Sequence, residues 1–234
     1  MSKLAYKRIL LKLSGEVLGK RGGGIDPNKI VTVVKIIKSA YKAGAEIGIV
    51  VGGGNWWRKR DADQTIKPAV SDYIGMIGTV INGMALASYL DKVGIKTLLQ
   101  AYLVSAPGVK AIDTKKAKQA LRLGQVVIFA GGTGKPFVTT DTAAAVFARD
   151  IKANAIFKVG DVDGVYSADP DKNSRAYKYS SITFTQAIKM RLKIFDLGAY
   201  EICRRAKIPV LVFKWSKTNL MKALQGQHVG TIIE

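Results

Sequence analysis

Short apolar runs alternate with longer amphipathic stretches along most of the chain. Apolar, β-rich runs of strand length occupy 6–13, 46–51, 95–104, 125–130, 155–159 and 208–215. Helical periodicity lies between them, at 27–43, 69–92, 114–123, 140–153, 184–191, 196–206 and 216–225. Nearly continuous apolar strands that alternate with helices are typical of a sheet covered on both faces. The pattern predicts an α/β fold with a central, mostly parallel sheet, and a short last strand, "TIIE", is expected to close an edge.

Nothing in the sequence suggests a division into several domains. The 234 residues contain no repeat and no low-complexity linker, so we predict a single domain over 1–234. No apolar run reaches the roughly 18 residues that a membrane span needs, and "MSKLAYKRILLKLSG" lacks a signal-peptide core. A single cysteine, Cys203, fits a reducing cytosol, and one Cys with one His argues against a zinc site. We therefore expect a cytoplasmic protein with no membrane segment.

The formal charge of +20 is the strongest signal in the composition. Such a charge favours a polyanionic partner, either nucleic acid or a small ligand that carries phosphate. However, the Lys and Arg residues are spread along the chain, and no basic run is interleaved with aromatic residues as in single-strand binders. We favour a solvated, lysine-rich surface, and nucleic-acid binding has no support beyond the net charge.

Glycine-rich loops follow four of the predicted strands. They read "KLSG" (12–15), "GGGN" (52–55), "GGTG" (131–134) and "GDVDG" (160–164). In parallel sheets, ligands bind beyond the carboxyl ends of the strands, and glycines let backbone N–H groups approach phosphate oxygens. Gly52–54 is expected to run into a helix, with Arg58 one turn later as a bidentate phosphate ligand. The shared placement of the loops predicts a phosphate-handling site.

The stretch "AGGTGKPFVTTDTAA" (130–144) begins like a phosphate-binding P-loop but departs from it, because Pro136 stands where a Walker A loop needs Ser or Thr. Thr139 or Thr140 can instead cap a helix whose first turn contains Asp141. Asp141 is then either an ordinary helix N-terminal acid or a group that orients Lys12 or helps hold a metal ion. Lys12, at a strand end, can neutralise charge on a transferred phosphoryl group.

A fourth motif, "DVDGVYSADP" (161–170), combines acids, a turn and an aromatic residue. Tyr166 can pack against a flat base, and Asp169 can accept a hydrogen bond from a nucleoside. The alternative is an acidic surface turn that ends at Pro170.

Together these residues resemble the bacterial UMP kinases (uridylate kinases), which have the amino-acid kinase fold. The resemblance rests on "YKRILLKLSGE", "GGGNWWR", "SDYIGM", "GTGKPFVTTDTAA" and "VDGVYSADP", in that order over almost the whole chain. It implies a three-layer sandwich with a central, mostly parallel sheet, whose N-terminal part binds mainly UMP and whose C-terminal part binds mainly ATP. It also implies transfer of the γ-phosphoryl group of Mg-ATP to UMP, giving UDP and ADP, by a cytoplasmic homohexamer.

The resemblance also implies roles for individual residues. Lys12 would stabilise the transferring group, Asp141 would organise the catalytic centre, and Asp72 would bind the ribose of UMP. The implied ATP site comprises Lys12, Leu13, Ser14, Gly15, Gly54, Arg58, Gly160, Tyr166 and Asp169. The implied UMP site comprises Gly53, Asp72, Thr133, Gly134, Lys135, Pro136, Phe137, Val138, Thr139 and Thr140. Mg²⁺ would be held mainly by the ATP phosphates, so no metal ligand is assigned to the protein.

Three alternatives stay open from the sequence. The acceptor can be a carboxylate or carbamate, as in acetylglutamate and carbamate kinases, although "GTGKPFVTTDT" and Asp72 favour a nucleotide. The basic chain can be a nucleic-acid-binding regulator, or a nucleotide-binding protein without turnover. Positions that carry GTP activation in many relatives hold Ala87 and Asp91 here, and Gly160 replaces a frequent Thr, so regulation is also left open.

Overall fold

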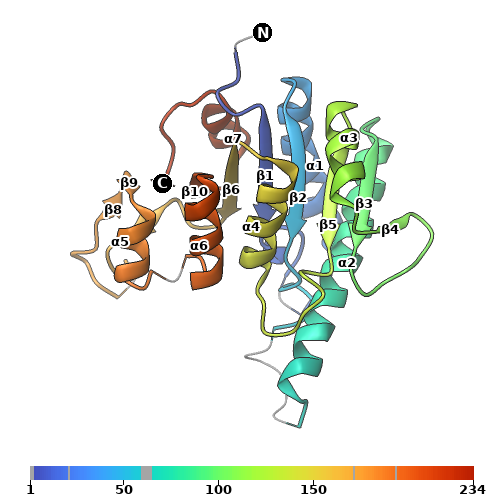
Figure 1. Cartoon of the computed structure of the whole chain (residues 1–234), viewed down its shortest axis with the longest axis horizontal. Coiled ribbons are helices and arrows are strands. Elements are labelled where there is room, and N and C mark those ends of the chain that lie inside the picture. The colour runs from blue at the N-terminus through green and yellow to red at the C-terminus, as the bar shows by residue number, and fades with distance from the viewer. Residues whose placement is uncertain (1–2, 21, 59–64, 171, 193) are drawn as a thin grey trace.

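The computed structural model describes residues 3–20, 22–58, 65–170, 172–192 and 194–234 and contains a nine-stranded sheet (Figure 1). In spatial order its strands are β4 (Val109–Ala111), β3 (Thr97–Ala101), β5 (Val126–Ala130), β2 (Glu46–Val51), β1 (Arg8–Leu13), β6 (Ala155–Gly160), β10 (Val210–Lys214), β11 (Thr231–Ile233) and β9 (Ser181–Ile182). A separate two-stranded sheet pairs β7 (Val165–Tyr166) with β8 (Lys178–Tyr179).

All neighbouring strands from β4 to β10 run parallel, and β11 is antiparallel to β10. The prediction of an α/β fold with a mostly parallel sheet is therefore confirmed. The expectation that "TIIE" closes an edge is wrong, because β9 pairs with the far side of β11.

Helices cover both faces of the sheet. One layer contains α1 (Pro27–Lys42), α2 (Pro68–Lys92) and α7 (Lys217–Leu224). The other layer, in front in Figure 1, contains α3 (Thr114–Arg122), α4 (Thr140–Ile151), α5 (Phe184–Lys189) and α6 (Leu197–Ala206). Successive side chains of β1 alternate between the two cores, since Leu10 belongs to the core on the α4 side of the sheet whereas Leu11 belongs to the core on the α1 side. This alternation explains why the central strands are apolar on both faces.

The 25-residue helix α2 has two different apolar faces. Its inner face packs on the sheet, where Gly83 lies against Leu99 and Ile128. Its other face exposes an apolar stripe formed by Val70, Tyr73, Ile77, Ile81 and Met84. By length and mean hydropathy α2 would suffice to cross a membrane, contrary to the expectation that no apolar stretch is long enough, and 44% of its most apolar window is buried inside the protein.

All predicted elements are present, with ends that coincide or differ by at most three residues. The strand predicted at 95–104 is shorter, because the backbone turns after Ala101 and Leu103 adopts a φ of 71°. The strands β4, β7, β8 and β9 were missed, since elements of two or three residues carry no periodic pattern. A short 3₁₀ turn, η1 (Gly15–Val17), directly follows β1.

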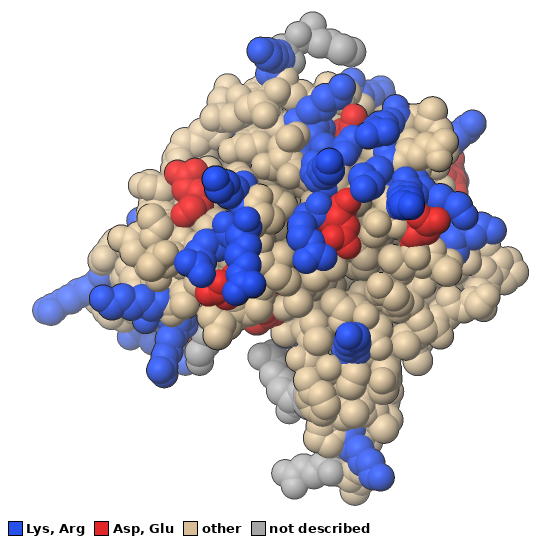
Figure 2. Space-filling view, viewed as in Figure 1, with Lys and Arg blue, Asp and Glu red and all other residues tan. Residues whose placement is uncertain are grey.

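Lysine and arginine side chains are distributed over much of the α3–α6 face, with fewer acidic residues between them (Figure 2). Exposed examples lie on three of its helices: Lys115, Lys116, Arg122, Arg149, Arg204 and Arg205. The positive charge on this face is spread over several helices, which agrees with the interpretation of a solvated basic surface.

Candidate active site

The four glycine-rich loops meet at one edge of the sheet. The parallel strands β2, β1 and β6 are neighbours, so the loops after Val51, Leu13 and Gly160 leave the sheet side by side. The loop after β5 joins them through the pairing of β5 with β2. The placement predicted from the sequence is confirmed.

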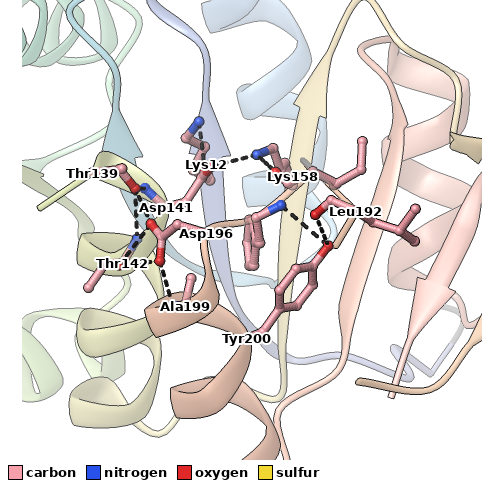
Figure 3. A network of polar contacts seen from close by, with 11 residues as sticks. Lys12, Thr139, Asp141, Thr142, Lys158, Leu192, Asp196, Ala199 and Tyr200 are labelled. Atoms are coloured by element: carbon pink, nitrogen blue, oxygen red, sulfur yellow. Dashed lines mark hydrogen bonds and ion pairs between the residues drawn. The ribbon is translucent and has the colours of Figure 1, made fainter. Parts of the chain in front are cut away.

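At this edge, one carboxylate lies between two lysines (Figure 3). Lys12 Nζ lies 2.9 Å from Asp141 Oδ1, and Lys158 Nζ lies 2.7 Å from Asp141 Oδ2. The three side chains are only 12–18% exposed, so their charges act with little screening by water. The group carries two positive charges and one negative charge, which leaves an excess positive charge for an anionic ligand.

The electrostatics follow from this arrangement. Burial by itself raises the pKa of Asp141, but the charges of Lys12 and Lys158 outweigh it, so the carboxyl pKa lies below its ordinary value. Burial, together with the charge of Lys12, lowers the pKa of Lys158 to about 8, although Asp141 acts in the opposite direction. Asp141 is thus an ionised carboxylate at neutral pH, and the lowered pKa of Lys158, about 8, leaves this lysine mostly charged there.

Lys158 was missed from the sequence, although a signal was present. It is the single charged residue of "AIFKV", a strand that is otherwise apolar. In the sheet it lies directly opposite Lys12 in the register of β1 and β6. Its ammonium group also donates to the carbonyl oxygen of Ile194 and lies 4.7 Å from the centre of the Phe195 ring.

Helix α4 begins as the sequence predicts. Thr139 is its N-cap and accepts hydrogen bonds from the backbone N–H groups of Asp141 and Thr142 at 3.0 and 3.3 Å. The cap places Asp141 in the first turn, facing the lysines. A second carboxylate, Asp196, accepts from Thr139 and Thr142 and was also missed, because it lies 54 residues beyond Thr142 in the chain.

A cavity of about 450 Å³ opens beside the first turn of α4. Seven of its lining residues were predicted as nucleotide ligands. Five of them were predicted for UMP (Gly53, Asp72, Val138, Thr139 and Thr140), whereas Gly54 and Arg58 were predicted for ATP and lie in the same cavity. Trp57, Ser71, Gly75, Met76, Thr79 and Gly132 complete the lining. The structure thus brings together residues that are up to 87 positions apart, and we call this space the acceptor cavity.

The Gly52–54 segment forms a turn and not the expected helix start. The backbone N–H groups of Trp56 and Trp57 both donate to the carbonyl oxygen of Gly53, at 2.9 and 3.0 Å. Gly53 packs so closely on α2 that a Cβ atom there would lie 2.4 Å from the carbonyl oxygen of Gly75. Arg58 forms an ion pair with Glu16 of η1, so it links the loops after β1 and β2.

The loop from Thr133 to Phe137 borders this region without lining the acceptor cavity. The backbone N–H of Phe137 donates to Asp72 Oδ2 at 2.8 Å, and Phe137 as a residue is 69% exposed. Lys135 is exposed as well, whereas Gly134 and Pro136 are half-buried. The Thr133 hydroxyl oxygen is buried without a hydrogen-bond partner among the described residues. The loop is therefore joined to α2 through the hydrogen bond between Phe137 and Asp72.

A larger cavity, of about 770 Å³, is connected to the lysine pair through Ile194, which lines it and accepts a hydrogen bond from Lys158. Tyr166 and Asp169 line it, as do Leu192 and Ile194, and we call it the donor cavity. Tyr166 donates from its hydroxyl to Asp163 at 2.9 Å, which holds the ring at the cavity wall. Gly160 lies outside it and lines a third cavity, of about 320 Å³, with Glu16.

The predicted residues after β1 contribute in different ways. The side chain of Leu13 is fully buried in the core. Ser14 caps η1, and Gly15 lies so close to the next loop that a Cβ atom would be 2.8 Å from the carbonyl oxygen of Gly52. Leu13 can therefore offer a ligand only its backbone.

Known proteins share this fold and sequence along the whole chain. The model of the amino acid kinase family matches residues 7–214. The uridylate kinase of Fervidobacterium nodosum is 44% identical over 230 residues, covering 97% of this chain and 98% of that protein. The crystal structure of UMP kinase from Bacillus anthracis superposes with a TM-score of 0.93 at 31% identity, covering 98% of this chain and 96% of the other.

A second solved structure agrees with the first. UMP kinase from Ureaplasma parvum superposes with a TM-score of 0.90 at 33% identity, covering 97% of this chain and 98% of that chain. These relatives are all uridylate kinases, and each is matched over nearly its full length. The chain therefore belongs to the amino acid kinase family and, within it, to the uridylate kinases.

Proposed function

We propose that the chain is a UMP kinase that transfers the γ-phosphoryl group of ATP to UMP, giving UDP and ADP. The observation that carries the proposal is the Asp141 carboxylate with its two lysines, which is linked to both cavities by neighbouring residues. Asp141 adjoins Thr140, which lines the acceptor cavity, and Lys158 contacts Ile194, which lines the donor cavity. Charge stabilisation and positioning are the main requirements of phosphoryl transfer.

In this mechanism a phosphate oxygen of UMP attacks the γ-phosphorus of ATP, and the bond to the β,γ-bridging oxygen breaks. UMP already carries the ionised nucleophile, so no protein base is required. Lys12 and Lys158 stabilise the equatorial oxygens of the transferring group, and Asp141 fixes both ammonium groups before the substrates arrive. Asp72 binds the UMP ribose, and Tyr166 and Asp169 hold the adenosine part of ATP.

A magnesium ion fits this site as part of Mg-ATP. Among the described residues, no group of three His, Cys, Asp or Glu side chains lies close enough together to hold a metal ion. Magnesium usually keeps waters and binds through substrate phosphates with one or two carboxylates. We therefore assign the ion mainly to the ATP phosphates, where it would neutralise charge on them.

We also propose a homohexamer of single-domain, cytoplasmic chains. The exposed stripe of α2, formed by Val70, Tyr73, Ile77, Ile81 and Met84, supports assembly, since soluble proteins seldom leave such a row in water.

The acceptor cavity is lined by residues 53–140 and the donor cavity by residues 161–214, which supports an N-terminal UMP side and a C-terminal ATP side.

The test is direct product analysis. Purified protein is incubated with Mg-ATP and UMP, and nucleotides are separated by anion-exchange chromatography. We expect UDP and ADP to form in equal amounts, and no UDP to form with Lys12→Ala. ADP formation that does not depend on UMP would instead identify an ATPase, and the proposal would fail.

A further inference from the structure

The Asp196 carboxylate joins two helix starts that lie far apart in the sequence (Figure 3). As the N-cap of α6 it accepts from the backbone N–H of Ala199 at 2.7 Å. It also accepts from the Thr142 hydroxyl at 2.7 and 2.8 Å and from the Thr139 hydroxyl. Capping α6 needs only one acceptor oxygen, so the contacts to α4 go beyond what α6 itself requires.

Thr139 forms hydrogen bonds both to the start of α4 and to Asp196 at the start of α6. Its hydroxyl oxygen accepts from the backbone N–H groups at the start of α4, and its hydroxyl proton goes to Asp196. Asp196 therefore reaches the backbone of Asp141 through one hydroxyl group. Thr139 also lines the acceptor cavity, so this contact belongs to the acceptor side of the site.

The segment just before Asp196 belongs to the donor side. The carbonyl oxygen of Ile194 accepts from Lys158, and Ile194 lines the donor cavity. The Tyr200 hydroxyl holds the same segment, because it accepts from the Phe195 N–H at 3.4 Å and donates to the Leu192 carbonyl at 3.3 Å. The segment is thus attached to α6 by Tyr200 and to α4 by Asp196.

We propose that Asp196 is a positioning residue that locks the first turn of α4 to the 194–196 segment, so that Asp141 and Lys158 keep one geometry when both nucleotides bind. The proposal rests on the function proposed above. Asp196 forms no hydrogen bond or ion pair with either lysine among the described residues, although its charge acts on Lys158 across space. Its contacts run through Thr139, Thr142 and the chain that leads to Ile194. It couples the acceptor side to the donor side.

Space around the carboxylate is tight as well. A Cβ atom on Gly198 would lie 3.3 Å from both Asp196 Oδ1 and Thr142 Oγ1. A glycine at position 198 therefore leaves room for the hydrogen bonds between Asp196 and Thr142.

The cleanest test removes the hydroxyl and keeps the carboxylate. Thr142→Val is nearly isosteric and lies outside the lining of both cavities. We expect kcat to fall about tenfold, as for the loss of one charge-assisted hydrogen bond, while KM for each nucleotide changes less than about threefold. Thr142→Ser returns the hydroxyl and should restore kcat to within about twofold.

Asp113→Asn is the matched control. Asp113 caps α3 on the same face of the sheet, accepting from Lys115 and Lys116 N–H groups at 3.0 Å, and has no contact with α4 in the structure. It should change thermal stability and leave kcat unaltered. If Thr142→Val behaves like Asp113→Asn, Asp196 is only a structural cap and the proposal is overturned. A rise in KM for one nucleotide alone would also overturn it.

Binding measurements separate this proposal from the proposed function. By calorimetry, UMP is titrated with and without a non-hydrolysable ATP analogue, which needs no turnover. The measured quantity is the ratio of the UMP affinity with the analogue to the UMP affinity without it. We expect this ratio to move towards one in Thr142→Val and in Asp196→Asn. An unchanged ratio in both variants contradicts the coupling, whereas a wild-type protein that binds both nucleotides and forms no UDP contradicts the proposed function alone.

Discussion

Lys12 and Lys158 lie directly opposite each other on the parallel strands β1 and β6, and both contact Asp141. Two lysines in adjacent positions of one sheet face repel each other, and a shared carboxylate offsets only part of that repulsion. The remaining positive charge is available to an anionic ligand, which in the proposed mechanism is the transferred phosphoryl group.

Replacing Lys158 tests whether the second lysine takes part in the reaction. Lys158→Met keeps the apolar stem and removes the charge, so we expect kcat to fall about 100- to 1000-fold, as for loss of a transition-state donor. Lys35→Met, on the exposed side of α1, is the matched control and should leave kcat unchanged. Steady-state kinetics with both substrates saturating measure the effect. A near-normal kcat in Lys158→Met would remove this residue from the mechanism.

The titration of Lys158 predicts the pH dependence of the enzyme. Its pKa of about 8 means that the charged form is lost as pH rises through 8, so kcat/KM should fall above that pH. Bound phosphate groups favour the charged form of Lys158, so the fall in kcat should occur at a higher pH than the fall in kcat/KM. Lys158→Arg stays charged throughout and should lose the limb while keeping some activity. A wild-type limb that persists in the arginine variant would assign it to another group.

Asp141 links activity to stability at acid pH. Because its folded pKa is lowered, its contribution to stability is complete above the unfolded pKa and disappears as pH falls through the folded value. Asp141→Asn leaves two buried ammonium groups without their partner, so we expect a loss of about 3 kcal/mol near pH 7.

Urea unfolding at pH 7 and below pH 3 checks this expectation. The difference between Asp141→Asn and wild type should shrink at the lower pH, where the wild-type carboxyl is increasingly protonated. A difference that is equal at both pH values would mean that the ion pairs do not account for it. The variant should also lose nearly all turnover.

Replacing Asp72 should raise the KM for one substrate more than the KM for the other. It lines the acceptor cavity and accepts from the Phe137 N–H. Asp72→Ala should raise KM for UMP about 10- to 100-fold, as for loss of charge-assisted hydrogen bonds, with a much smaller effect on KM for ATP. Initial rates with each substrate varied in turn give both values. Equal effects on the two KM values would contradict a ribose-binding role.

Gly53 tests the close approach of the second glycine loop to α2. Gly53→Ala would place its Cβ atom 2.4 Å from the Gly75 carbonyl oxygen, so the loop or the helix must shift. We expect a loss of about 1–3 kcal/mol and weaker UMP binding. Gly23→Ala, whose Cβ atom would meet its nearest neighbour at 3.4 Å, is the control and should be nearly neutral. Chemical unfolding and UMP titration measure the two effects.

The sequence predicted the parts of the molecule that depend on local pattern. Apolar strands and amphipathic helices follow from periodicity, and the Thr139 cap follows from the order of Thr and Asp residues. The placement of Lys12 beside Asp141 was one of two interpretations, and the ion pair between them favours it.

The parts that were missed depend on which strands become neighbours. Lys158 and Asp196 reach the site because β6 pairs with β1 and because α6 packs against α4, and neither fact has a local signal. The 52–54 segment was predicted to start a helix. In the structure, buried Asn55 and Asn82 exchange hydrogen bonds and hold the segment as a turn, and a contact between residues this far apart has no local signal. The residues assigned to ATP and UMP remain predictions that ligand-bound experiments must test.

The measurement that tests the central claim most directly is acceptor choice. ADP production from Mg-ATP is followed with UMP, CMP, AMP, GMP and acetylglutamate offered separately at equal concentration. We predict turnover confined largely to UMP, with none from Lys12→Ala. Turnover with acetylglutamate in preference to UMP, or none with any acceptor from folded wild-type protein, would contradict the assignment of this site to UMP phosphorylation.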